Sequence, residues 1–181
     1  MRIRRGVTLV IFVLIPLLTI ESAEAAKNCS LPDLKTLTAD SPECLFYEGT
    51  RAYREKKYNW AIDYWRRLMA MKNLPVDSEH LKTSAINNLG YLSFYGLGTK
   101  ADKKMAVDLW QYAFRAGEEE SAYHLCHIYA DAKEQTHNAD LAGGYCREAL
   151  RRYARLRGDA ETEKQFARIK AHLQSLEKPS P

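Results

Sequence analysis

The chain has 181 residues, of which 46% are hydrophobic and 28% are charged, and its formal net charge is +4. This length suits a single domain with a sizeable apolar core. The charge is mild and no basic, aromatic surface motif accompanies it, so the composition argues against a nucleic-acid partner.

The N-terminus has the order of a secretory signal peptide. Arg2, Arg4 and Arg5 precede an apolar stretch over residues 7–20, and a small-residue A-x-A site follows. This order predicts a signal peptide over residues 1–25 that is removed after export. A membrane-spanning helix needs about 20 apolar residues, so a retained anchor fits less well. We therefore expect a periplasmic or secreted protein whose membrane contact is at most peripheral.

Beyond this segment the chain predicts helices throughout. Apolar residues recur at helical spacing, and short polar or glycine-rich stretches separate the runs. After an N-terminal extension over 26–40, the expected helices cover residues 43–55 and 58–72, a pair within 84–117, a further pair after 118, and a final helix over 160–176, with a frayed tail over 178–181.

Residues that favour helix ends mark several boundaries. Ser41 precedes Pro42, which predicts a capped helix with proline in its first turn. Asp77 or Ser78 is expected to cap the first helix of the central pair. The three glutamates at 118–120 complement the positive N-terminal end of another helix.

The central pair, within residues 84–117, has the clearest pattern. Gly90 lies inside its first helix although glycine costs about 1 kcal/mol there, so it needs a packing reason. We expect the second helix to approach closely, with the small Ala106 and Ala113 facing Gly90. Between the two helices, Gly96 and Gly98 allow a tight turn.

The central pattern returns downstream at an offset of 36 residues without a gap. Leu89 corresponds to Leu125, and Ala106 corresponds to Ala142. A repeat of this length built from two helices indicates an α-solenoid. The loop over 131–138 lacks the glycines of the central turn, so it either takes another shape or continues the helix.

Four cysteines in an exported protein predict two disulfides, with three pairings open. The first two cysteines lie close in sequence. In the 36-residue register the last two take the positions of Gly90 and Trp110, which should face each other. The predicted pairs are therefore Cys29–Cys44 and Cys126–Cys146.

Catalytic or metal chemistry has little support in the sequence. A metal site built from the last two cysteines with His124 and His127 is the rival interpretation, but its spacing fits no standard zinc pattern. Ser175 and Lys178 match a bare S-x-x-K element without its partner motifs. No nucleophile, base and orienting group converge near the histidines. We expect no catalytic residue, no cofactor and no metal.

The central pair resembles the Sel-1-like repeat family. Its elements are Ala-x-x-x-Leu-Gly over 85–90, Gly-x-Gly over 96–98, and Lys-Ala-x-x-Leu-Trp over 104–110 with Met105 interposed. Residues 58–65 are similar to part of a tetratricopeptide unit. The chain departs from the family at Ser93, where tyrosine is expected.

This resemblance implies a fold and a subgroup. The fold is all-α: an α-solenoid of about three helix-turn-helix repeats over residues 41–157, followed by a capping helix and tail over 158–181. The last pair is similar to exported Helicobacter cysteine-rich proteins, in which a disulfide staples each hairpin.

The resemblance also implies a binding face. In tetratricopeptide-like superhelices the first helix of each pair lines a concave surface where ligands lie. Side chains of Tyr, Phe, Arg and Asn are favoured at such surfaces, although any one of them can equally belong to the core or the rim. The residues expected on this face are Phe46, Thr50, Tyr53, Arg54, Asn87, Tyr91, Phe94, Tyr123, His127 and Asp131.

A second candidate surface is basic. A solvated helix face is the simplest interpretation, and an acidic partner or an anionic membrane surface is the sharper one. Its residues are Arg147, Arg151, Arg152, Arg155 and Arg157.

Three functions fit these features to different degrees. The favoured one is a non-enzymatic adaptor that binds a protein or peptide partner on the concave face. The second is an immunity protein that neutralises a periplasm-targeted toxin such as a lipase, a role that small exported Sel-1-like proteins also have. An enzyme acting on cell-wall material or β-lactams, as proposed for Helicobacter relatives, lacks an activated nucleophile here. The oligomeric state and the partner's identity are left open.

Overall fold

The structure is a computed structural model that describes residues 28–156 and 158–177. These residues contain seven α-helices and no strand, which confirms the all-α prediction. The helices are α1 (Pro42–Arg54), α2 (Tyr58–Ala70), α3 (Glu79–Tyr95), α4 (Lys103–Arg115), α5 (Glu119–Ala130), α6 (Ala139–Tyr153) and α7 (Ala160–Leu176), with short 3-10 helices at Pro32–Leu34 and Val76–Ser78. The predicted signal peptide and C-terminal tail lie outside the described residues.

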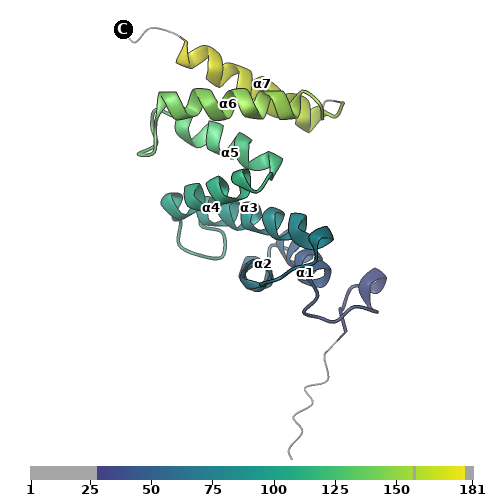
Figure 1. Ribbon diagram of the computed structural model, residues 1–181. Helices are drawn as coiled ribbons and strands as arrows, with labels where there is room; N and C mark the ends of the chain where they lie inside the picture. Colours follow the sequence, from purple (N-terminus) through teal and green to yellow (C-terminus); the bar gives the residue numbers. More distant parts are fainter. Residues whose placement is uncertain (1–27, 157, 178–181) are drawn as a thin grey trace, which may run out of the picture.

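Helices that follow each other in the chain pack against each other. α1 packs on α2, α3 on α4, and α5 on α6, and contacts between α2 and α3, α4 and α5, and α6 and α7 join the pairs. The pairs succeed one another from the N-terminal end of the molecule to α7 at the other end (Figure 1). Within the described residues no helix combines the length and apolar character needed to cross a membrane.

Most predicted helix ends agree with the structure. Ser41 Oγ accepts a hydrogen bond from Cys44 N at 3.2 Å, as expected of a cap before Pro42. The final helix covers the expected residues. Of the two predicted caps of α3, Ser78 takes the N-cap position, but its side chain makes no capping hydrogen bond. Its hydroxyl donates to Glu43 Oε1 at 2.8 Å.

Gly90 allows the close approach of α4 to α3. A Cβ atom at this position would lie 2.6 Å from Trp110 Nε1, so only glycine leaves room for the indole. Trp110 fills this space rather than the expected Ala106 and Ala113, although both alanines are buried. The indole N–H donates to Asn87 O at 3.1 Å, so its polar atom is satisfied in the core.

The other two helix pairs have a close interhelical contact at the position that corresponds to Gly90 and Trp110. In the first pair, Gly49 of α1 lies against the indole of Trp65, whose Nε1 donates to Phe46 O at 3.2 Å. In the third pair, a disulfide joins Cys126 of α5 to Cys146 of α6, with 4.6 Å between the two Cα atoms. The predicted pairing of these cysteines is confirmed.

The segment before α1 is tied to it by the second disulfide. Cys29 and Cys44 are bonded, with 5.7 Å between their Cα atoms, which confirms the other predicted pair. Cys29 N also donates to Leu37 O at 2.9 Å, so the extension folds back on itself before the chain enters α1.

The loop between α5 and α6 does not continue the helix. α5 ends at Ala130, and the backbone N–H of Asn138 returns to Tyr129 O at 3.0 Å. The central loop has the same closure between Asp102 N and Ser93 O at 2.8 Å. The 36-residue register therefore holds for this hydrogen bond even though the glycines are missing.

Replacement of Gly90 by alanine tests the close contact between α3 and α4. We expect Gly90→Ala to lower the free energy of unfolding by about 1–3 kcal/mol, because the buried indole must shift. Gly144 is the matched control, since a Cβ atom there would meet nothing within 4 Å. Gly144→Ala should leave stability unchanged or raise it by up to about 1 kcal/mol. Urea unfolding measures both, and equal stability of Gly90→Ala and the wild type would refute the contact.

Candidate functional site

A hollow of about 500 Å³ lies between the helices α1, α3, α5 and α7. We call it the tyrosine hollow. It is lined by Thr50, Tyr53, Arg54, Trp65, Asn87, Asn88, Tyr91, Tyr95, Glu120, Tyr123, His124, His127, Glu161, Gln165 and Arg168. Apart from Trp65 of α2, these residues come from the first helix of each pair and from the final helix.

Seven of the ten residues expected on a binding face line this hollow: Thr50, Tyr53, Arg54, Asn87, Tyr91, Tyr123 and His127. The other three lie elsewhere. Phe46 packs against the core around Trp65, and Phe94 lies beside Trp110 with 5.6 Å between ring centroids. Asp131 follows the end of α5, where its side chain accepts a hydrogen bond from Lys133 N.

Tyrosine rings form the centre of the hollow. The ring centroid of Tyr91 lies 6.2 Å from that of Tyr53 and 4.7 Å from that of Tyr95. Burial and the neighbouring Tyr53 raise the pKa of Tyr91, so its hydroxyl stays neutral and can donate a hydrogen bond. The rings therefore offer both apolar faces and polar edges to a bound molecule.

His124 is held neutral at the base of the hollow. Its ring stacks on the Trp110 indole with 4.6 Å between centroids, and only 12% of its side chain is exposed. Burial and the nearby His127 lower the pKa of His124 to about 3. The His124 ring therefore carries no charge at neutral pH and lines the hollow as a neutral aromatic ring.

The final helix supplies one side of the hollow. His172 of α7 and His127 of α5 share a hydrogen bond, with 2.7 Å between Nε2 and Nδ1. Burial lowers the pKa of both rings, which favours this neutral pair. Arg168 Nη1 donates to the hydroxyl of Tyr123 at 3.3 Å. α7 is thus more than a cap, because it contributes three residues to the lining.

The other eight lining residues were not predicted for the binding face. They are Trp65, Asn88, Tyr95, Glu120, His124 and the α7 residues Glu161, Gln165 and Arg168. The acidic run at 118–120 was assigned to a helix start, and α7 was assigned to covering the last pair. The face of α7 has no pattern of its own that indicates a site. The spacing of Glu120 and His124, one turn apart on α5, was the available signal, since it places both on one face of the helix.

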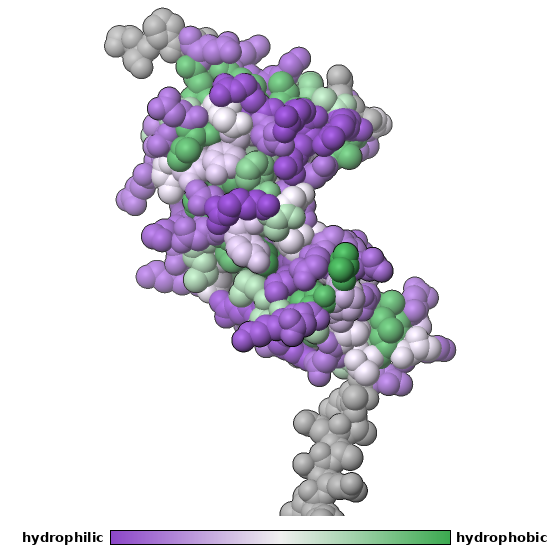
Figure 2. All heavy atoms as spheres, viewed as in Figure 1, coloured by the Kyte–Doolittle hydropathy of each residue, from purple (hydrophilic) through white to green (hydrophobic). Residues whose placement is uncertain are grey.

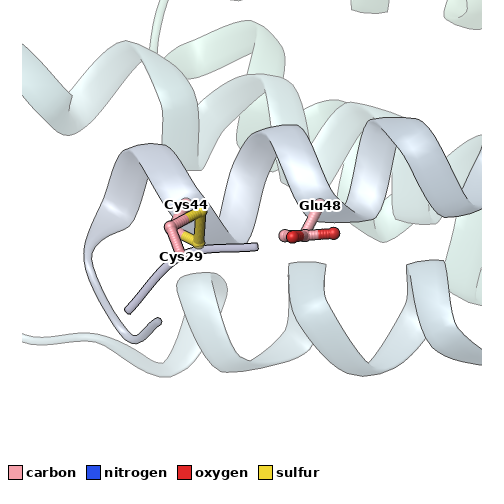
Figure 3. Close-up of side chains that lie close together, drawn as sticks. All are labelled: Cys29, Cys44 and Glu48. Carbon is pink, nitrogen blue, oxygen red and sulfur yellow. A yellow bond between two sulfur atoms is a disulfide. The ribbon is translucent and has the colours of Figure 1, made fainter. Parts of the chain in front are cut away.

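The described residues place one group of possible metal ligands together. Cys29, Cys44 and Glu48 have ligand atoms within 4.8 Å of one another, and Figure 3 shows the two cysteines bonded with Glu48 farther along α1. A disulfide supplies no thiolate, and Glu48 already binds Arg51 and Ser30. The Cys126–Cys146 disulfide likewise excludes the rival metal site near His124 and His127.

Three of the five arginines of the basic strip pair with acids of the same chain. Arg151 and Arg152 pair with Glu148, and Arg155 Nη2 lies 3.2 Å from Glu119 Oε1. This is the arrangement of a solvated helix face. Arg157 lies outside the described residues. So does Lys178, while the hydroxyl of Ser175 donates to His172 O at 2.7 Å.

Comparison with known proteins finds no family model that matches the chain and no significantly similar curated protein.

Three histidines with lowered pKa values make the free energy of unfolding depend on pH. Below about pH 6.5 the unfolded chain binds protons that buried His124, His127 and His172 do not, so the free energy of unfolding falls on acidification. Glu120 acts in the opposite direction, because its raised pKa lets the folded chain take up a proton early. From His124 alone we expect a loss of about 2 kcal/mol between pH 7 and pH 5.

Urea unfolding at several pH values checks this prediction. His124→Gln should flatten the pH dependence, whatever its effect on stability at pH 7. The exposed His80 is the control, and His80→Gln should keep the wild-type slope. An unchanged slope in His124→Gln would contradict a neutral, buried imidazole.

Proposed function

We propose that this protein is a non-enzymatic, exported adaptor that binds a segment of a partner protein in the tyrosine hollow. Its helix pairs form a short α-solenoid of the Sel-1-like type, with α7 as its final element. The observation that carries the proposal is the gathering of seven expected face residues around one hollow of about 500 Å³.

The composition of the hollow favours a protein segment as ligand. Tyrosine and arginine contribute most to protein binding, and Tyr53, Tyr91, Tyr95, Arg54 and Arg168 all contribute to the lining. The lining mixes aromatic faces with polar and charged groups of both signs, which suits a polypeptide backbone with varied side chains.

Contacts within the chain hold the helices around the hollow in place before a ligand binds. Its helices are held by buried tryptophans, by the Cys126–Cys146 disulfide and by the hydrogen bond between His127 and His172. A rigid receptor loses little conformational entropy when a ligand binds, so more of the contact energy appears as affinity.

Export supports a partner outside the cytoplasm. The sequence predicts a cleavable signal peptide, and the two disulfides belong to an oxidising compartment. We therefore place the adaptor in the periplasm or outside the cell. A captured partner that proves to be a secreted toxin would make this adaptor an immunity protein.

Site-specific photocrosslinking in intact cells tests the proposal. A photoreactive amino acid at Asn88, in the hollow, should crosslink a defined partner, whereas the same group at the exposed Asp63 of α2 should not. Mass spectrometry then identifies the partner. Crosslinks of equal yield from both positions would count against the hollow.

Tyrosine substitutions provide the quantitative test with the identified partner. We expect Tyr53→Ala and Tyr91→Ala each to weaken binding by roughly tenfold or more, because aromatic anchors contribute about 2 kcal/mol. Tyr112→Ala is the matched control, since this exposed tyrosine of α4 lies outside the hollow. Calorimetry on variants with native circular dichroism measures the change, and full affinity in the double mutant would exclude the site.

A further inference from the structure

Glu120 lies in the wall of the tyrosine hollow. Its Oε2 accepts a hydrogen bond from Asn87 Nδ2 at 3.1 Å, and its Oε1 lies 3.8 Å from Nε2 of the neutral His124. Among the described residues no lysine or arginine pairs with its carboxylate. The side chain remains 47% exposed, toward the hollow.

The two preceding glutamates, in contrast, are satisfied by groups of this chain. Glu118 accepts a hydrogen bond from Ser84 Oγ at 2.6 Å, and Glu119 pairs with Arg155. Burial in the concave wall and the charge of Glu118 raise the pKa of Glu120. A cation brought by a ligand would relieve this unfavourable environment.

The surroundings of Glu120 suit an organic cation. Tyr91 lies next to His124, with 6.0 Å between ring centroids, and His124 is one helical turn from Glu120. The electron-rich faces of Tyr53, Tyr91 and Tyr95 can attract a cation that the carboxylate neutralises. Glu161, in the first turn of α7, adds a second acid to the lining.

The basic groups of the hollow do not occupy this place. Arg168 is directed to the hydroxyl of Tyr123. Arg54 is exposed at the C-terminal end of α1, whereas Glu120 lies in the first turn of α5. Neither arginine of the lining therefore pairs with Glu120, although the charge of Arg168 acts on Tyr95.

We propose that the tyrosine hollow recognises a basic side chain of the bound segment, lysine or arginine, with Glu120 as its counter-charge. This proposal rests on the proposed function of the hollow. The ammonium or guanidinium group lies between the Glu120 carboxylate and the tyrosine faces, and a charge-assisted hydrogen bond joins the two chains.

Short peptides test this recognition without knowledge of the partner. The probes are N-acetylated, C-amidated tri-lysine and tri-arginine, with tri-glutamine and tri-glutamate as comparisons. The reporter is the Trp110 indole N–H resonance in NMR, because Trp110 donates to Asn87, which in turn binds Glu120. The chain carries a net charge of +4, so general attraction for a cationic peptide is not expected.

We expect saturable shifts with tri-lysine or tri-arginine and none with the comparison peptides. Glu120→Gln should weaken the binding about tenfold, because it keeps the shape of the side chain and removes its charge. Glu119→Gln is the matched control and should bind as the wild type does. Binding should also weaken in acid as Glu120 takes up its proton.

The outcomes separate this proposal from the proposed function. Absence of binding by both basic peptides, or equal binding by Glu120→Gln and the wild type, overturns basic side-chain recognition. If the crosslinked partner nevertheless depends on Tyr53 and Tyr91, the adaptor function holds and only the recognition chemistry is wrong. Failure of the tyrosine variants to affect the partner would instead overturn the adaptor function itself.

Discussion

The fold depends on one contact between the two helices of each pair. In the first two pairs a glycine of the leading helix admits a buried tryptophan of the following helix, and the indole N–H finds a carbonyl one turn before that glycine. In the third pair a disulfide takes the same position. α6 contains adjacent glycines at 143 and 144, each of which costs helix stability. A covalent bond that contributes about 3 kcal/mol offsets such a loss.

This contact determines which surfaces face the hollow. Trp65 and Trp110 pack against the glycines of the leading helices, and Tyr53 and Tyr91 of these helices line the hollow. Trp65 lines it as well, beside Tyr53, with 6.1 Å between the two ring centroids. α7 packs against α5, where His172 and His127 share a hydrogen bond. It joins α1, α3 and α5 in lining the hollow. In the space-filling view apolar residues are scattered among polar ones rather than gathered in one broad patch (Figure 2). On the face drawn there, no broad apolar patch offers an alternative to the hollow as a candidate binding surface.

Local signals made the helices and disulfides predictable. Ser41 and Pro42 marked the start of α1, and the 36-residue register brought Cys126 opposite Cys146. The register did not predict which neighbour each side chain contacts. Phe94 of α3 was predicted on the binding face, yet it packs beside Trp110 of α4 in the same pair, and the Ser78 hydroxyl donates to Glu43 of α1. α7 contributes residues to the hollow only because it packs against α5. The hydrophobic pattern within α7 does not predict that contact.

The packing of the central pair extends to the chemistry of the hollow. Gly90 lets Trp110 approach, the Trp110 indole stacks on His124, and this burial keeps His124 uncharged. A protonated His124 would be the natural counter-ion of Glu120, whose carboxylate lies 3.8 Å away. Because packing removes that charge, Glu120 has no cation from its own helix. The close packing at Gly90 thereby leaves Glu120 without a charged partner on its own helix, in a hollow that Glu161 also lines.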